Sequence, residues 1–454
     1  MALSISIAFF LSVFLLPTST AQPTLSSNEQ QAVYKLLESI NAAFQWRLLF
    51  PDDLCSSSPH GIVCELFEEP TGDYSVHITE LSFGFVSDYS SNPFCTPNST
   101  INPHHLTPLT HLRKLFFYKC FTGTPVTFPN FSPLNISIQH LVFIDNPSLV
   151  GSITGKISNM NLIRFILTGS NVSGEIKSAF GDLDNAEEIT LSRNQFTGEL
   201  PPEIFGNMNK LKILDLSQNG LEGNLPKSTG GLTGLLKLDL SYNRFSGEIP
   251  ETLKAMKDLE FLDLSYNVFT NSGIPAFFSG MTSLREVYLN GNLLGGHIPE
   301  IWENLKGIIG IGLSGNGLIG NIPPSMGLAL KKVSYIGLDN NNLEGPIPEE
   351  FGALENVYEI NLENNRLSGS LPFGAQFVNK MGKKLKLAGN PELCVEKRAI
   401  NGSLMNLRLC RKKPTTFESP LVSTLLRTSS SAAIQEWPCF LMFFIWSVFL
   451  MFLL

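Results

Sequence analysis

The chain has 454 residues, of which 43% are hydrophobic and only 16% are charged, so it has ample material for a folded core. Its 37 glycines and 28 prolines are too few for a collagen-like or a disordered chain. The formal net charge of −8 argues against a general nucleic-acid-binding protein, because neutralising phosphate groups requires a basic surface.

The N-terminus carries an apolar run over residues 5–16, followed by the small residues Ser19 and Ala21. This pattern predicts a secretory signal peptide over residues 1–21, cleaved after Ala21. A buried strand or helix is the alternative interpretation of the same run. A signal peptide implies export to an oxidising compartment, where disulfide bonds persist.

An amphipathic helix is predicted over residues 30–46, and a strand around residues 76–83. From residue 141 the chain then repeats the phrase L-x-L-x-x-N-x-L-x-G-x-I-P at intervals of 24 or 25 residues. The asparagine slot of this repeat falls at Asn146, Ser170, Asn194, Asn219, Asn243, Asn267, Asn292, Asn316, Asn341, Asn365 and Asn390. Cys120 occupies the same slot one turn earlier.

The repeat has a direct physical interpretation. Two leucines separated by one residue, such as Leu214 and Leu216, point to the same face of a short strand, and stacking the repeats buries them in one core. The slot asparagine turns the chain and can bond backbone groups that lack partners. We therefore predict an α/β-type solenoid: a right-handed leucine-rich-repeat superhelix with a parallel concave sheet, few α-helices, an irregular or 3-10 convex side and disulfide-bonded caps.

The post-asparagine segment ends in Ile/Leu-Pro, as in Leu225-Pro226, and proline cannot donate to a sheet interior, so we expect this segment to pair only weakly or to form a sheet edge. A solenoid also needs caps at its ends. The predicted organisation is residues 22–120 as an N-terminal cap with a first irregular repeat, 121–390 as leucine-rich repeats, 391–410 as a C-terminal cap, 411–436 as a stalk and 437–454 as a hydrophobic tail.

The cysteines lie only near the two ends of the chain. Sequence proximity suggests the pairs Cys55–Cys64, Cys95–Cys120 and Cys394–Cys410, although six cysteines allow fifteen connectivities. Five N-x-S/T sequons predict glycosylation, at Asn98, Asn130, Asn135, Asn171 and Asn401.

The tail over residues 437–454 contains no charged residue and includes the seventh cysteine, Cys439. Small residues precede it, so we expect a GPI-anchor signal with lipid attachment at Ser429 or Ser430. A retained transmembrane tail is the alternative, because 18 apolar residues just reach across a bilayer. In both cases the folded part lies on the extracellular face of the plasma membrane.

The full phrase L-x-x-L-x-x-L-D-L-S-x-N-x-L-x-G-x-I-P, seen around residues 232–250, resembles the repeat of plant extracellular leucine-rich-repeat proteins. The flanking segments ITELSFG, LRKLFFYKCFT and FVNKMGKKLKLAGNPELC are similar to a subfamily of receptor-like proteins without a kinase domain. The resemblance implies a cell-surface protein that takes part in the response of a plant to a root-colonising fungus.

No residue pattern in the sequence indicates a catalytic, metal-binding or cofactor-binding site. The seven histidines form no paired-ligand motif, and no nucleophile elbow, phosphate-binding loop or dinucleotide fingerprint occurs in a suitable context. We therefore predict neither an enzyme nor a metal or cofactor site.

The remaining candidate for a functional site is the concave face, toward which the residues between the leucines of each strand project. Aromatic side chains there are expected to form one patch, since neighbouring strands are about 4.8 Å apart. The predicted ligand-binding residues are Lys237, Asp239, Tyr242, Phe261, Asp263, Tyr266 and Tyr288. The alternative is that these aromatic side chains merely cover the sheet. Glycines at the following strands are expected to leave the backbone bare for a partner, at Gly310, Gly312, Gly315 and Gly337.

The sequence thus predicts a recognition module that binds a peptide, a glycan or a partner ectodomain and acts with a receptor kinase as co-receptor. The alternative function is a secreted or wall-associated inhibitor of microbial wall-degrading enzymes, which would use the same concave face.

Overall fold

The computed structural model describes residues 23–57, 59–84, 92–132, 134, 137–157, 160–176, 183–396 and 407–410. All of them belong to one compact unit that ends at Cys410. Several predictions lie outside the described residues: the signal peptide, the stalk, the hydrophobic tail, the lipid attachment at Ser429 or Ser430, and the sequons at Asn135 and Asn401.

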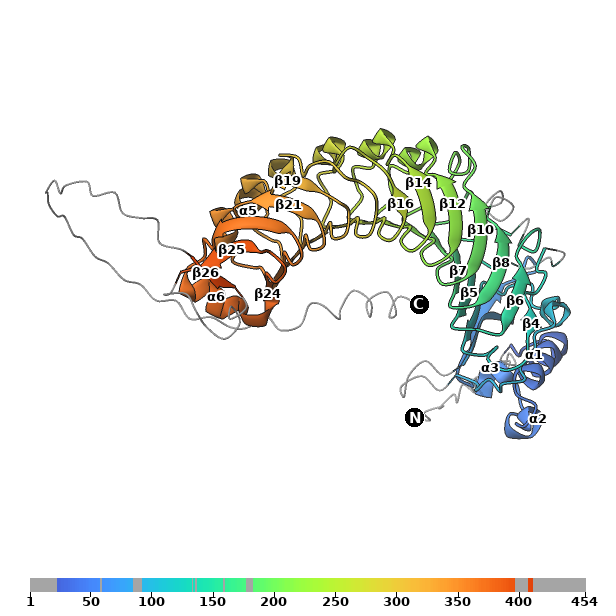
Figure 1. Ribbon diagram of the computed structural model, residues 1–454. Coiled ribbons are helices and arrows are strands. Elements are labelled where there is room, and N and C mark those ends of the chain that lie inside the picture. Colours follow the sequence, from blue (N-terminus) through green and yellow to red (C-terminus); the bar gives the residue numbers. More distant parts are fainter. Residues whose placement is uncertain are drawn as a thin grey trace, which may run out of the picture. The chain divides into compact units, whose positions relative to one another are not determined.

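One long sheet of 14 strands runs through this unit, and each coil adds one short strand to it (Figure 1). Only the first pairing, β1 with β2, is antiparallel, and the pairings from β2 onward are parallel. In order, the strands are β1 (Ile62–Glu68), β2 (Tyr74–Phe83), β3 (Lys114–Tyr118), β5 (His140–Ile144), β7 (Arg164–Thr168), β9 (Glu188–Thr190), β11 (Ile213–Asp215), β13 (Lys237–Asp239), β15 (Phe261–Asp263), β17 (Glu286–Tyr288), β18 (Gly310–Gly312), β20 (Tyr335–Gly337), β22 (Glu359–Asn361) and β24 (Leu385–Lys386). The predicted leucine-rich-repeat solenoid with a parallel sheet is confirmed.

The core is continuous from Leu25 to Val395, because each coil buries its apolar residues against the next coil. The slot asparagines hold these coils together. Asn243, for example, donates its side-chain amide to the carbonyl oxygen of Leu216 in the preceding coil at 2.9 Å, and its Oδ1 accepts from the backbone N–H of Leu221 at 3.1 Å. The same bonding recurs along the chain and forms a ladder that satisfies backbone groups at every turn.

A second set of parallel strands follows the asparagines, so the expectation that this segment pairs only weakly is wrong. These strands form a seven-stranded sheet of β4 (Val126–Thr127), β6 (Leu149–Ser152), β8 (Asn171–Glu175), β10 (Gln195–Glu199), β12 (Gly220–Asn224), β14 (Arg244–Gly247) and β16 (Val268–Phe269), and a five-stranded sheet of β19 (Ile319–Asn321), β21 (Asn342–Gly345), β23 (Arg366–Ser370), β25 (Glu392–Val395) and β26 (Arg408–Leu409). The physical reason is that each strand ends before the proline, as β12 ends before Pro226 and β14 before Pro250, so no ladder hydrogen bond is lost.

Helical elements are short, and Figure 1 shows the 3-10 turns along the outer side of the coils. The α-helices are α1 (Ser27–Ile40), α2 (Trp46–Leu49), α3 (Leu54–Ser57), α5 (Pro324–Ala329) and α6 (Ala375–Met381). The 3-10 helices are η1 (Pro103–Leu106), η2 (Lys227–Gly231), η3 (Glu251–Ala255), η4 (Ala276–Gly280), η5 (Trp302–Asn304), η6 (Glu349–Ala353) and η7 (Gly382–Lys384). Several begin directly after the repeat proline, whose fixed φ suits a helix start.

The first helix ends earlier than the sequence suggested, at Ile40 instead of Trp46. Asn41 is responsible: its side chain accepts from the backbone N–H of Ala43 at 3.1 Å, and its carbonyl oxygen accepts from Trp46 Nε1 at 2.9 Å. These bonds turn the chain away from the helix direction. Phe44, which falls inside the predicted helix but beyond the observed one, is consequently exposed.

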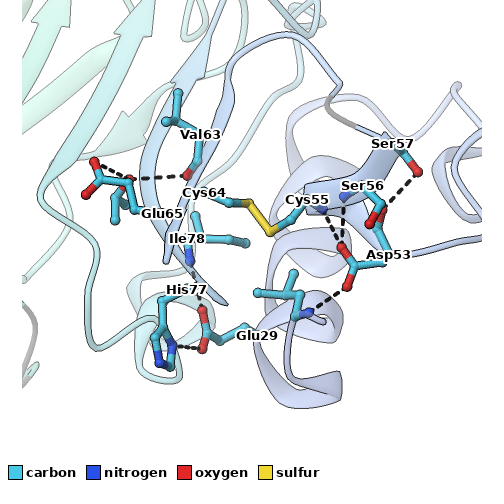
Figure 2. Close-up of a disulfide and its surroundings, with 12 residues drawn as sticks. Glu29, Asp53, Cys55, Ser56, Ser57, Val63, Cys64, Glu65, His77 and Ile78 are labelled. Atoms are coloured by element: carbon cyan, nitrogen blue, oxygen red, sulfur yellow. Dashed lines mark hydrogen bonds and ion pairs between the residues drawn. A yellow bond between two sulfur atoms is a disulfide. The ribbon is translucent and has the colours of Figure 1, made fainter. Parts of the chain in front are cut away.

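The N-terminal cap is tied together by a disulfide and a buried carboxylate (Figure 2). The disulfide joins Cys55 of α3 to Cys64 of β1. Glu29 of α1 is buried and reaches β2, where it accepts from the backbone N–H of Ile78 at 3.1 Å and lies 2.6 Å from His77 Nδ1. These links hold the helix against the open end of the solenoid core.

Two further disulfides join the cysteines that proximity in the sequence suggested. Cys95 is bonded to Cys120, which occupies the first ladder slot, and Cys394 of β25 is bonded to Cys410 after β26. Within the described ranges, no helix has the length and apolar character needed to cross a membrane.

Candidate functional site

The candidate site is the inner face of the long sheet across β11, β13, β15 and β17, and we call it the central face. In each coil the leucines point into the core, and the alternate residues point away from it. The strands are in register, so Asp215, Asp239 and Asp263 lie side by side on neighbouring strands, followed by Tyr288. Equivalent residues of successive coils therefore form rows across the face.

One lysine, Lys237, forms ion pairs within the row of aspartates. Lys237 Nζ lies 3.0 Å from Asp215 Oδ2 and 3.8 Å from Asp239 Oδ2, and 5.4 Å from the ring centre of Phe261. Each aspartate also accepts from the residue two positions later, as in the 2.7 Å bond from Ser241 Oγ to Asp239 Oδ1. The serines therefore solvate this row of aspartates.

The side chains of Lys237, Asp239 and Asp263 have little exposed surface, and burial contributes to a shift in the pKa of each. Burial and the neighbouring Asp215 carboxylate raise the pKa of Asp239 to about 6, although Lys237 opposes the shift. Burial likewise raises the pKa of Asp263. For Lys237, burial lowers the pKa, but the carboxylates of Asp215 and Asp239 outweigh burial, so its pKa is raised overall. The face therefore holds more negative charge than its single lysine compensates.

Tyr242 and Tyr266 form the most exposed aromatic pair on this face, with 51% and 49% of their surface accessible. Their rings are stacked, with centroids 4.3 Å apart and planes at 19°. Both residues stand directly before a ladder asparagine and have left-handed backbone conformations, with φ of 53° and 54°. A bulky residue in this conformation costs about 1–2 kcal/mol, and such strain is concentrated at functional sites.

The left-handed conformation belongs to the position directly before each ladder residue. Every non-glycine residue with positive φ in the described part of the chain precedes a ladder position: Lys119, Asp145, Arg193, Gln218, Tyr242, Tyr266, Asn340 and Asn364. The remaining coils have glycine there, at Gly169, Gly291, Gly315 and Gly389. Glycine and asparagine recur at this position in the sequence, and both residues favour left-handed backbone. The sequence therefore indicated this conformation, although it was not among our predictions.

Other side chains of this row are already engaged with one another, which the sequence analysis missed. Arg193 pairs with Asp145 at 2.8 Å across the intervening Gly169, and Asn364 Nδ2 donates to Asn340 Oδ1 at 2.9 Å. The first contact joins coils two turns apart, and the second joins adjacent coils. The tyrosine pair, in contrast, presents half of its surface to solvent.

Phe261 of β15 and Tyr288 of β17 form a second aromatic pair, with ring centroids 5.9 Å apart. Both side chains are only partly exposed, and the Tyr288 hydroxyl donates to Glu286 Oε2 at 2.9 Å. Burial and the Glu286 carboxylate raise the pKa of Tyr288. The expected patch of four aromatic residues is thus two distinct pairs, of which Tyr242 and Tyr266 are the accessible one.

The expectation that glycines leave the next strands bare is wrong for three of the four positions. A Cβ atom at Gly310 would lie 2.6 Å from the Tyr288 hydroxyl, and one at Gly312 would lie 2.6 Å from Asn290 Nδ2. At Gly337 a Cβ would collide with the hydroxyl of Tyr335. These glycines therefore make room for side chains of the chain itself and do not admit a partner's backbone.

Three predicted glycosylation sites fall in described parts of the chain, and Asn98, Asn130 and Asn171 are all exposed. Their glycosylation stays a prediction. Across the residues that the structure describes, no group of three or more His, Cys, Asp or Glu side chains is placed to hold a metal ion.

Comparison with known protein families finds the leucine-rich-repeat family. One model, described as "Leucine rich repeat", matches residues 184–245, and a second with the same description matches residues 283–305 and 332–354. The first match spans β11 and β13, which carry Asp215 and Asp239 of the aspartate row.

Among curated proteins, the chain is similar to two from Arabidopsis thaliana. It is 34% identical to Receptor like protein 29 over 170 residues, covering 36% of this chain and 35% of the relative. It is 31% identical to Piriformospora indica-insensitive protein 2 over 161 residues, covering 34% of this chain and 35% of that protein. The chain therefore matches about a third of the length of these relatives.

Among solved structures, the chain resembles the ectodomain of the plant membrane receptor kinase GASSHO1/SCHENGEN3 from Arabidopsis thaliana, crystallised in complex with CASPARIAN STRIP INTEGRITY FACTOR 2. The two are 26% identical with a TM-score of 0.55, and the match covers 72% of this chain and 43% of the ectodomain. The chain is therefore a leucine-rich-repeat solenoid related to plant extracellular receptor-like proteins and to the ectodomains of plant leucine-rich-repeat receptors.

Proposed function

We propose that this chain is an extracellular recognition module that binds a polypeptide ligand or partner ectodomain on its central face and acts together with a receptor kinase. The observation that carries the proposal is the exposed, stacked pair of Tyr242 and Tyr266. Exposed tyrosines supply much of the binding energy in protein interfaces, because they bury a large area and lose little conformational entropy.

The related proteins support this function. The similar ectodomain of GASSHO1/SCHENGEN3 was crystallised with a bound factor, and Receptor like protein 29 carries a receptor-like designation. By analogy, the present chain would recognise a partner outside the cell. The resemblance to Piriformospora indica-insensitive protein 2 adds the proposal that this recognition belongs to the response of a plant to a fungus.

The test uses tagged full-length protein expressed in plant cells and recovered from solubilised membranes. Tyr242 and Tyr266 are both replaced by asparagine, because Asn340 and Asn364 hold the same backbone conformation with φ of 55°. The double variant thus removes both rings without adding strain. We expect the recovery of co-purified leucine-rich-repeat receptor kinases to fall by about 10-fold, as for the loss of an interface hot spot.

A matched control removes an equally exposed tyrosine elsewhere. Tyr74 lies at the start of β2 with 57% of its surface accessible, and Tyr74→Asn is expected to leave the recovery unchanged. Equal recovery of receptor kinases by the wild type and the double variant would remove the tyrosine pair as the binding surface and refute the proposed function.

A further inference from the structure

The central face has an unequal balance of charge. Its strands carry four acidic side chains and one basic side chain: Asp215, Lys237, Asp239, Asp263 and Glu286. The lysine lies between Asp215 and Asp239, at 3.0 and 3.8 Å. Glu286 accepts from the Tyr288 hydroxyl at 2.9 Å. The positive charge on the face is therefore committed to the first two aspartates.

Asp263 is the least compensated of the three aspartates, because Lys237 acts on it only from a distance and forms its ion pairs with the other two. It accepts from the backbone N–H of Ser265 at 2.8 Å, but it forms no ion pair with any residue that the structure describes. It pairs in register with Asp239 on one side and with Tyr288 on the other. A carboxylate next to another carboxylate and short of a cation gains more than an isolated one from an added positive charge.

The tyrosine pair lies next to this carboxylate. Tyr266 is three residues beyond Asp263 in the same coil, and Asp263 is close enough to Tyr242 to raise the pKa of its hydroxyl, after burial and Tyr266 itself. One face of the Tyr266 ring is stacked on Tyr242, and the other lies over Gly291, where a Cβ atom would come within 2.8 Å of the ring. The pair therefore offers ring edges and hydroxyls, which suit the backbone and side chains of a polypeptide better than the flat face of a sugar ring.

We propose that the partner segment recognised on the central face is a basic peptide, which places a lysine or arginine side chain against Asp263 while its chain crosses Tyr242 and Tyr266. This proposal rests on the proposed function and specifies the chemistry of the ligand. An arginine fits best, since its planar guanidinium can pair with a carboxylate through two parallel hydrogen bonds. The excess of negative charge would also attract such a segment before contact.

The experiment selects binders from a random octapeptide display library on the immobilised full-length protein. The affinities of the selected peptides are then measured by isothermal titration calorimetry. Three variants are compared with the wild type: Asp263→Asn, which keeps the shape of the side chain; Glu222→Gln, which removes one negative charge from the exposed outer strand β12; and the Tyr242→Asn/Tyr266→Asn pair. Urea unfolding of each variant checks that it is folded.

We expect the selected peptides to be enriched in arginine and lysine, and Asp263→Asn to weaken their binding by about 10-fold or more, as for the loss of a charge-assisted hydrogen bond. Glu222→Gln, with the same change in net charge, should leave affinity within about twofold. Peptides without basic residues, or equal losses in Asp263→Asn and Glu222→Gln, would overturn the inference.

The outcomes also separate this inference from the function beneath it. Peptides that lose affinity in the tyrosine variant but keep it in Asp263→Asn would retain the central face as the binding site and overturn only the basic ligand. Selected peptides that bind all variants equally would overturn both.

Discussion

The asparagine ladder provides two opposite substitutions whose effects on stability can be worked out from its hydrogen bonds. Asn243 is buried, and its amide donates to the carbonyl oxygens of Leu216, Leu240 and Ser241 at 2.9, 3.1 and 3.2 Å. Its Oδ1 accepts from the backbone N–H of Leu221 at 3.1 Å. The two amide hydrogens are thus shared among three carbonyl oxygens, and together with the bond to Oδ1 the side chain makes about three hydrogen bonds.

A serine at position 243 is too short to reach across coils and has one donor. It would lose about two of these three bonds, at a net cost of about 1 kcal/mol each, so we expect Asn243→Ser to lower the free energy of unfolding by about 2 kcal/mol. The buried backbone N–H of Leu221 would also lose its Asn243 acceptor, which adds to this cost.

The chain contains the reverse case at Ser170, the one ladder slot after Cys120 without asparagine. Ser170 is buried, and among the described residues its Oγ has no hydrogen-bond partner. An asparagine there can reach the carbonyl oxygens that its equivalents bond in other coils. We therefore expect Ser170→Asn to raise the free energy of unfolding by about 1–2 kcal/mol.

The assay is urea unfolding of the purified protein, monitored by far-UV circular dichroism. The dependence of the unfolding free energy on urea concentration is compared between variants, because repeat arrays can unfold in more than one step. Asn209→Ser serves as the control: Asn209 is an exposed asparagine outside the ladder, and its loss should change stability by less than about 0.5 kcal/mol. If Asn243→Ser costs no more than this control, or Ser170→Asn destabilises the protein, the ladder does not stabilise the coils in the way argued here.

Two further predictions concern the face and the outer turns. Because the pKa of Asp239 is raised from 3.8 to about 6 by burial and by Asp215, the folded protein binds a proton between these pH values that the unfolded chain has lost. The wild type should therefore gain up to about 3 kcal/mol of stability relative to Asp239→Asn as the pH falls from 7 to 4, and a difference that does not vary with pH would contradict this. On the outer side, a Cβ at Gly230 would collide with the backbone carbonyl of Thr252, whereas one at Gly231 meets nothing within 4 Å. Gly230→Ala should lower stability by about 1–3 kcal/mol in thermal or urea unfolding and Gly231→Ala should not, and equal effects would show that the contact is relaxed at no cost.

The sequence by itself determined the architecture. The invariant position of the asparagine and the alternating leucines specify a coil of 24 or 25 residues that cannot bury its own apolar side, so stacking is the only stable outcome. The cysteine pairs could also be proposed from proximity, because Cys55 and Cys64 are only nine residues apart. These are local or periodic properties, and one chain is enough to reveal them.

The tertiary structure decided which side chains of the inner face are free. Tyr242 and Tyr288 occupy comparable rows in the sequence, yet Tyr242 is exposed, while Tyr288 lies over Gly310 and bonds to Glu286. The seven-stranded and five-stranded sheets were not predicted for a related reason. The position of their strands relative to the prolines depends on how successive coils align. Such outcomes depend on the size of the residue facing each side chain in the next coil, 24 or 25 positions away, and no local pattern contains that information.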